Sequence, residues 1–186
     1  MSTIRFPMTP AIAVDSHRDI DLLERRGIPL DGCIRTRTTR SVAEITGAYL
    51  RGVRMFVIGG ADELADFREL PDVTVLVQLD FAGAFPRARD AERGVTPHAA
   101  ARTVGACRAA GIRVAGFTLD LSRGPAVVRG RRVRRAVALM RRLERTGHPG
   151  LDTLDLDLGD RDAHGDLRTA VRGAARRYRV VARSAA

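Results

Sequence analysis

Ionisable side chains recur at the points where apolar, strand-like runs of this sequence end. Four of them have the chemistry of general acids and bases, namely Asp15, His17, Asp120 and Asp157. Proton transfer needs a group whose pKa lies near the working pH, which suits a histidine or a carboxylate with carboxylate neighbours. The carboxyl ends of parallel strands meet at one face of β/α folds. We therefore expect these four residues to lie together at that face, as the candidate catalytic groups.

A second set of polar residues at the same strand ends could hold a substrate. Arg35 and Arg37 are suited to clamp a substrate carboxylate through paired hydrogen bonds. The other candidates for substrate contacts are Ser16, Asp80, Ser122 and Arg123. Metal-binding spacings such as HxH or HExxH do not occur, so the sequence predicts no metal site.

These residues also have structural interpretations. His17 suits the exposed first turn of a helix as well as it suits catalysis. Asp155 and Asp157 alternate with leucines, so one set of side chains faces a barrel interior, where buried aspartates need partners. The arginines could supply them in an Asp–Arg network that fills the lumen. Cys33 and Cys107 lie inside predicted elements and are expected to be core residues.

The elements that must position these residues alternate between strand and helix. Strands are expected at about 11–15, 32–36, 54–58, 73–79, 113–119, 153–158 and 179–182. Helices are expected at about 18–26, 40–51, 61–69, 96–110, 130–146 and 164–177, with a working loop at 122–130. This alternation predicts an α/β fold, a TIM-like parallel β/α barrel of about seven strands that is incomplete or partly open. Residues 1–186 are expected to form a single domain.

The charge of the chain comes from one residue type. The formal net charge is +10, and all 32 basic residues are arginine, because the sequence contains no lysine. Abundant arginine, alanine, valine and glycine are typical of a very GC-rich genome. The densest arginine cluster lies on the predicted helix at 130–146, where a solvated helix face or an acidic partner would both fit. Base-stacking aromatic residues are scarce, so we do not expect a nucleic-acid partner.

Other features of the sequence limit its location and chemistry. It has no apolar run of 18 residues and its N-terminus lacks the apolar core of a signal peptide, so a cytoplasmic protein is expected. Pyridoxal phosphate (PLP) enzymes hold their cofactor as a Schiff base on a lysine. Arginine cannot replace that lysine, because its guanidinium stays protonated. We therefore expect no PLP and no other cofactor.

Several segments nevertheless resemble a PLP family, the fold-type III decarboxylases, which comprise ornithine and diaminopimelate decarboxylases with an alanine-racemase-like barrel. The resemblance covers about residues 10–182 and depends on the order and spacing of its pieces. Those pieces are Val14-Asp15-Ser16, Asp19-Ile20, Gly27-Ile28-Pro29, Cys33-Ile34, Arg40, Glu44-Ile45, Gly52–Phe56, Glu63-Leu64, Ala110–Phe117 and Leu151–Gly159. The resemblance implies the barrel fold.

The departures from this family concern its cofactor. The strand that carries the family's lysine would lie before residue 10, and the histidine that stacks on the cofactor ring falls at Asp120. The glycine-rich phosphate loop falls at Gly159–Asp162, where carboxylates would repel a phosphate. The family's C-terminal β domain has no counterpart in these residues. The resemblance therefore argues against the family's reaction.

Two classes of function remain open, and the sequence does not decide whether the protein is an enzyme. In the first, the chain is a PLP-independent, degenerate barrel that acts as a non-catalytic partner or binding protein in bacterial specialised metabolism. In the second, it is a cofactor-free lyase, isomerase or cyclase that uses the Asp/His groups for acid–base chemistry and the arginines as substrate clamps. Either class admits a small-molecule ligand, and we expect a homo-oligomer or a hetero-oligomer with another pathway protein.

Overall fold

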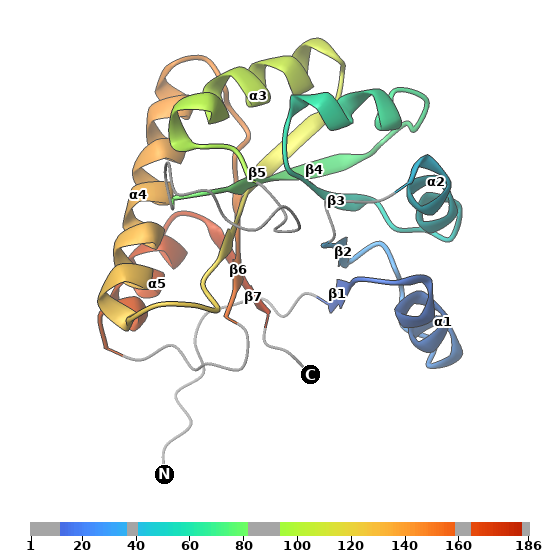
Figure 1. Cartoon of the computed structure of the whole chain (residues 1–186), viewed down its shortest axis with the longest axis horizontal. Coiled ribbons are helices and arrows are strands. Elements are labelled where there is room, and N and C mark those ends of the chain that lie inside the picture. The colour runs from blue at the N-terminus through green and yellow to red at the C-terminus, as the bar shows by residue number, and fades with distance from the viewer. Residues whose placement is uncertain (1–11, 37–40, 82–93, 159–164, 184–186) are drawn as a thin grey trace.

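Seven parallel strands form one sheet whose spatial order is the order of the chain, β1 to β7. The computed structural model describes residues 12–36, 41–81, 94–158 and 165–183, and the statements below concern these residues. The strands are β1 (Ile12–Val14), β2 (Cys33–Arg35), β3 (Met55–Ile58), β4 (Thr74–Leu79), β5 (Arg113–Asp120), β6 (Thr153–Asp157) and β7 (Arg179–Arg183). The sheet curls into a nearly closed barrel (Figure 1). The expected TIM-like α/β barrel of seven strands is thereby confirmed.

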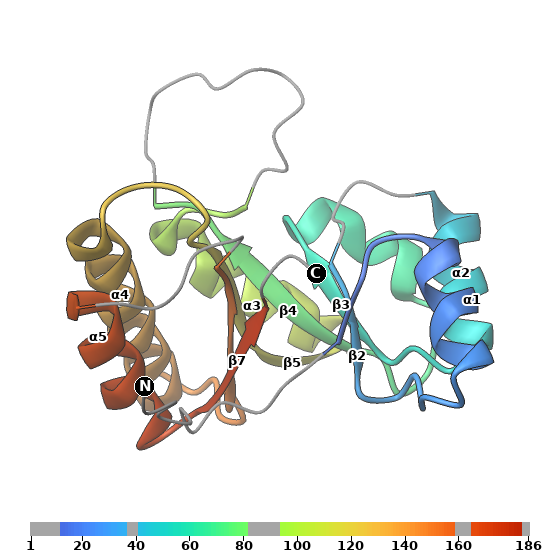
Figure 2. The same cartoon turned by 90° about the horizontal axis from the view of Figure 1, so that it is seen from below.

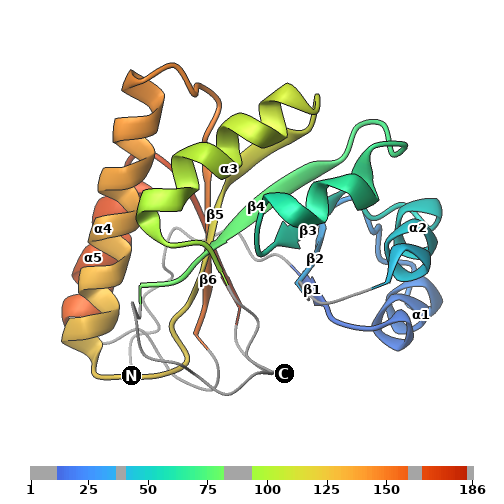
Figure 3. The ribbon, with the colours of Figure 1, turned by 45° about the horizontal axis from the view of Figure 1, so that its top comes forward.

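Helices connect consecutive strands and lie on the outside of the sheet. They are α1 (His17–Arg25), α2 (Val42–Leu50), the 3₁₀ helix η1 (Ala61–Phe67), α3 (Pro97–Ala109), α4 (Ala126–Arg145) and α5 (Gly165–Ala175). Figure 3 shows α4 and α5 side by side along one flank of the barrel, with α1 and α2 together on the other.

The first two helices begin at sequence signals that satisfy their free N–H groups. Ser16 caps α1 and accepts a hydrogen bond from the backbone N–H of Asp19, whose carboxylate accepts one from the backbone N–H of Ser16. Ser41 and Glu44 form the same reciprocal pair at α2. Each box supplies partners for donors that a helix start leaves open. The two helices therefore start at fixed points just beyond β1 and β2.

The strands separate two apolar layers of very different size. The main core lies between the sheet and the helices and includes Phe56, Phe117, Leu154 and Met140. A small second cluster lies on the other side of the strands, inside the barrel. It consists of Ile34, Val57, Leu76, Ala115 and Val181, with Met55 packed against it. Because side chains alternate along a strand, the polar residues that share this inner face come next toward the carboxyl ends.

The barrel has a seam that backbone hydrogen bonds do not close. β1 pairs with β2 and β7 pairs with β6, but the described residues contain no pairing between β1 and β7. Figure 2 shows the two edge strands on facing sides of the barrel, with α1 and α2 beyond β1 and α5 beyond β7. The incomplete closure expected from the sequence is therefore present.

One expected boundary is wrong. The loop predicted at 122–130 ends at Pro125, and α4 begins at Ala126. Gly130 caused the error, because an isolated glycine usually argues against a helix interior. Here a Cβ at Gly130 would lie 2.9 Å from the backbone oxygen of Asp166, so the glycine allows α4 and α5 to pack closely. The close approach of two helices compensates for the low helix propensity of the residue.

Candidate functional site

The carboxyl ends of β5, β6 and β7 bring three ionisable residues into one row. In the strand register Asp120 lies opposite Asp157, and Asp157 lies opposite Arg183. An Nη1 atom of Arg183 is 3.7 Å from a carboxylate oxygen of Asp157. The Asp157 side chain is 41% exposed, so this end of the barrel is open to solvent. This strand-tip row is the candidate functional site.

Beneath this row lies a largely buried ionic network. The Asp155 carboxylate is 0% exposed and accepts hydrogen bonds from Arg183, at 3.0 Å from Nε and 2.8 Å from Nη2. It also accepts one from the Thr118 hydroxyl at 2.5 Å, and Arg183 Nη2 donates to the same hydroxyl oxygen. Every member thus has a partner inside the barrel. The Asp–Arg network expected in the lumen is present between these residues.

The charge around Arg183 favours its protonated form. Burial lowers the pKa of Arg183, but Asp155, Asp157 and Asp15 together raise it above its ordinary value. The effect of Asp15 reaches across the seam, from β1 to β7. Arg183 is therefore a permanent cation that carboxylates surround on both sides of the seam.

Two of the four proposed acid–base residues are engaged in contacts with neighbouring residues of the protein. The imidazole of His17 packs against α2, where its Cε1 atom lies 2.9 Å from the position that a Cβ on Gly47 would occupy. The Asp120 carboxylate accepts hydrogen bonds from the backbone N–H of Ser122, at 2.9 Å, and from its hydroxyl, at 2.5 Å. Asp15 and Asp157 both lie near Arg183 and raise its pKa. The structure thus brings Asp15, Asp120 and Asp157 to the same end of the barrel and places His17 in the helical layer.

The proposed substrate-binding residues are scattered. Arg35 is 1% exposed, donates to the backbone oxygen of Val14 at 3.2 Å and lies 3.8 Å from the Glu44 carboxylate. Ser16 is occupied as the cap of α1, and Ser122 donates to Asp120. Asp80 follows β4 and is partly exposed, Arg123 is exposed, and Arg37 lies outside the described residues. Of these candidates, Ser122 adjoins the strand-tip row through a direct hydrogen bond to Asp120.

Arg35 has a structural environment at the start of two helices. Arg35 is two positions after Cys33 on β2, so the two side chains lie on the same face of the strand. Cys33 faces the main core, and the Arg35 side chain therefore lies on the helical side of the sheet. Burial raises the pKa of Asp19 in α1, but hydrogen bonds from Ser16 and from the backbone N–H groups of Asp15 and Ser16, with the charge of Arg35, lower it overall. Arg35 therefore stabilises the acidic first turns of α1 and α2.

The three residues of the network are only partly predictable from the sequence. Asp155 and Arg183 stand at strand ends, but they are not among the site residues that the sequence predicts. Thr118 was missed, although it precedes Asp120 by two positions and so shares its face of the strand. The alternation of side chains along the strand shows which residues share a face. It does not show how deep in the barrel each of them lies.

The thiols and possible metal ligands offer no further site. Cys33 and Cys107 are both buried, and burial raises the pKa of Cys107 to about 11. Burial also raises the pKa of Cys33, with a smaller effect from Asp31. Neither thiol is therefore an activated nucleophile. Within the described ranges no three histidine, cysteine or acidic side chains converge as a metal site, and no helix is long and apolar enough to cross a membrane.

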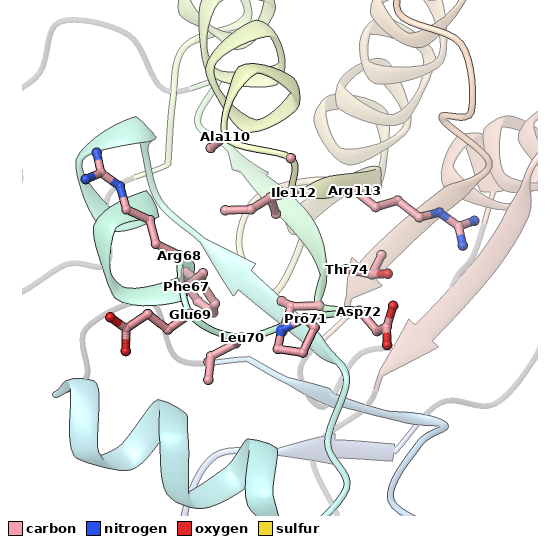
Figure 4. A pocket seen from close by; sticks show the side chains of 12 residues that line it. Phe67, Arg68, Glu69, Leu70, Pro71, Asp72, Thr74, Ala110, Ile112 and Arg113 are labelled. Atoms are coloured by element: carbon pink, nitrogen blue, oxygen red, sulfur yellow. The ribbon is translucent and has the colours of Figure 1, made fainter.

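A hollow of about 520 Å³ lies at the opposite end of the barrel. Figure 4 shows it between Phe67, Leu70, Pro71 and Ile112, with Arg68 and Arg113 on opposite sides. Thr74 and Arg113, the first residues of β4 and β5, belong to its lining, so it marks the amino ends of the strands. In β/α barrels this end contributes to stability, whereas sites lie at the carboxyl ends.

Comparison with solved structures identifies the fold. A lysine/ornithine decarboxylase from Vibrio vulnificus, complexed with putrescine, has a TM-score of 0.77 and 21% identity. The arginine decarboxylase of Paramecium bursaria Chlorella virus has a TM-score of 0.75 and 14% identity. A lysine decarboxylase from Selenomonas ruminantium has a TM-score of 0.74 and 16% identity. The fold is that of the decarboxylase barrel. The fold implied by the sequence resemblance is thus confirmed.

This likeness to the decarboxylase barrel has a defined extent. The three alignments each cover 94% of this chain but only 50%, 51% and 50% of the respective decarboxylases, so the chain spans about half their length. No protein-family model matches the sequence, and no curated protein matches it.

The residues at the strand tips do not fit PLP. The 186 residues contain no lysine that could form the Schiff base. Asp120 and Asp157 are adjacent carboxylates at the carboxyl ends of the strands, where β/α barrels bind their ligands. Their negative charges oppose a phosphate group at this point, and Arg183 offsets only part of them because it is also paired with Asp155.

Proposed function

We propose that this protein is a PLP-independent, decarboxylase-like barrel that serves as a non-catalytic partner or binding protein in bacterial specialised metabolism. The observation that supports this proposal most directly is the buried network. Asp155, the most enclosed carboxylate of the barrel, is engaged by Arg183 and Thr118 and so is not directed at an open pocket. A carboxylate held in this way specifies the structure of the lumen and has no free role in proton transfer.

The unsealed seam supports the same proposal. β1 and β7 are edge strands in the described structure, and Ile12 on β1 is an exposed apolar residue. Unpaired edge strands present free N–H and C=O groups that favour pairing with another chain. A partner protein would supply a natural cover for this edge. A homo-oligomer or a hetero-oligomer with a protein of the same pathway would meet this need.

A second candidate function is a cofactor-free lyase, isomerase or cyclase. It is favoured by the strand-tip row, where the half-exposed Asp157 stands beside Arg183 and in register with Asp120. A carboxylate could move a proton there while the guanidinium holds an anionic substrate. The packing of His17, on α1, against α2 weakens this candidate, because the histidine lies away from the row.

Co-expression with proteins encoded beside this chain tests the first proposal. Size-exclusion chromatography with light scattering should show a stable complex of fixed stoichiometry, and the complex should form equally with an Asp157→Asn variant. A chain that stays alone in every pairing would contradict the proposal. Turnover of a small substrate that is lost in Asp157→Asn would establish the enzyme instead.

Cofactor independence has its own measurement. After incubation with PLP and reduction with borohydride, mass spectrometry should find no adduct on a side chain, because only the N-terminal amine can form one. A stoichiometric adduct at any internal position would contradict this expectation.

A further inference from the structure

The outer face of α4 carries a dense cluster of arginines. The helix contains eight arginines and one acidic residue, Glu144, whereas the whole chain has a net charge of +10. Its inner stripe, which includes Val133, Ala136, Met140 and Leu143, is buried in the main core. The residues exposed on the other side form what we call the α4 arginine face, namely Val127, Val128, Arg131, Arg134, Arg135, Ala138, Arg141, Arg142 and Arg145.

Carboxylates of the described residues neutralise little of this face. Asp166 of α5 binds Arg134 at 2.9 Å, and Glu144 is bound by Arg177 at 2.7 Å. In the described part of the chain, Arg135, Arg141 and Arg142 have no carboxylate within ion-pair distance. The neighbouring helix α5 adds further arginines and no second exposed acid along this flank. The face therefore attracts an anionic surface.

Three exposed apolar residues accompany the arginines on this face. Val127 is 55% exposed and Val128 is 39% exposed, both in the first turn of α4, although valine favours burial. Ala138 is also exposed and lies eleven residues after Val127 on the same side of the helix. Eleven residues are three helical turns, or about 16 Å along the axis. The face thus alternates apolar contact points with cations.

We infer that the α4 arginine face is a docking surface for an acidic amphipathic helix of a partner protein. Glutamates on such a helix would pair with Arg135, Arg141 and Arg142, and its apolar side chains would cover Val127 and Ala138. Covering these apolar groups removes their surface from water, which favours the complex. This inference rests on the proposed function as a partner protein and adds the surface and the chemistry of its partner.

The same residues fit a nucleic acid less well. Nucleic-acid readers combine arginine with amide, hydroxyl or aromatic side chains that contact or stack on bases. The α4 arginine face offers none of these side chains, and a phosphate backbone would gain nothing from Val127 and Val128. An acidic protein helix satisfies both the charged and the apolar parts of the face.

A synthetic peptide can test this inference on the full chain. The probe is a 20-residue helical peptide with glutamates on one face and two leucines eleven positions apart. Its affinity should be at least tenfold higher than that of a scrambled peptide of the same composition, and it should fall as salt rises. A single-stranded DNA 20-mer and vesicles with anionic lipid should bind more weakly than the patterned peptide. Equal binding of both peptides, or tighter binding of DNA or vesicles, would overturn the inference.

Matched charge reversals locate the binding surface. Arg135→Glu with Arg142→Glu should weaken peptide binding at least tenfold. The control pair, Arg18→Glu with Arg25→Glu on the exposed part of α1, changes the net charge equally and should reduce binding much less. Circular dichroism should show that both variants are folded. If one of them does not fold, NMR of the isotope-labelled wild-type protein should show chemical-shift changes on α4 when the peptide is added. An equal loss in both pairs, or shifts confined to other helices, would refute the docking surface.

The inference and the proposed function can fail separately. If a co-expressed partner forms a stable complex that the Arg135→Glu, Arg142→Glu variant retains, the partner function stands and the α4 docking surface is wrong. If the patterned peptide binds α4 but no partner complex forms and turnover is found, the proposed function is wrong and the surface stands.

Discussion

Asp155 illustrates how a single carboxylate can be fixed by its neighbours. It has no exposed surface, and Arg183 and Thr118 satisfy its oxygens. Removing one charge from a buried pair leaves the other without compensation, which usually costs more than the intact pair contributes. The role of the residue is therefore best measured by a change that keeps its shape.

We expect Asp155→Asn to lower the free energy of unfolding by about 3–5 kcal/mol, because it leaves the Arg183 charge buried without its carboxylate. Urea unfolding followed by circular dichroism measures this value. Asp120→Asn is the control, since the exposed Asp120 carboxylate accepts hydrogen bonds from the nearby Ser122, and it should change stability little. Equal stability of Asp155→Asn and the wild type would show that the pair contributes nothing.

Arg129 presents the opposite case, a buried charge without compensation. It is 5% exposed at the top of the inner stripe of α4, and its Nε and Nη1 atoms have no hydrogen-bond partner in the described structure. Arg129→Met keeps the aliphatic contacts and removes the unsatisfied groups, so we expect it to raise stability by about 1–3 kcal/mol. Thermal unfolding compares it with Arg131→Met on the exposed side of the same helix, which should be nearly neutral. A destabilised Arg129→Met would mean that the guanidinium has a partner in solution.

At the residue scale, the sequence predicts the strand face on which a side chain lies better than it predicts the partners of that side chain. Alternation of leucine and aspartate in β6 predicts that Asp155 and Asp157 share one face of the strand, and the structure places Asp155 inside the barrel. It could not show that two residues separate a fully buried carboxylate from a half-exposed one. It also could not show that His17 turns toward Gly47, because that contact joins α1 to α2 across 30 positions of the chain.

Among the elements, β5 and β6 approach each other unusually closely. A Cβ on Gly116 would overlap the backbone oxygen of Thr153, and the register between β4 and β5 shifts just before this point. Glycine at this position therefore allows the strands to pair where the barrel curves. The helical elements follow a different rule, since their boundaries are set by caps.

Gly116→Ala should destabilise the protein by about 1–3 kcal/mol or more, because the added methyl group must push β5 away from β6. Gly173→Ala in α5 is the matched control, with no atom within 4 Å of the new Cβ. We expect this control to raise stability by about 0.5–1 kcal/mol, the usual gain from replacing a helical glycine. Chemical denaturation of the two variants measures both effects, and a stable Gly116→Ala would contradict the steric argument.

The elements were largely predictable because each carries its own local signal. Ser41 and Glu44 form the capping box that their spacing indicates, and Pro97 occupies the first turn of α3. The start of α4 was placed four residues late, because Gly130 reads locally as a helix breaker. Its packing against Asp166 depends on α5, which lies some 35 residues further along the chain.

For the whole molecule, the seam should be the part of the sheet that opens most readily. β1 and β7 have a strand neighbour on one side only, whereas β4 and β5 have neighbours on both sides. Local opening needs fewer contacts to break at an edge. We therefore expect amide hydrogens of β1 and β7 to exchange faster than those of β4 and β5, by at least tenfold. Hydrogen exchange followed by NMR measures this difference, and equal protection across the sheet would mean that something closes the seam.

The strand order also bears on how the chain is built. Each strand pairs with the one made just before it, and no strand is inserted between earlier ones. A nascent chain leaving the ribosome can therefore add one β/α unit at a time to the growing edge of the sheet, without rearranging what has already formed.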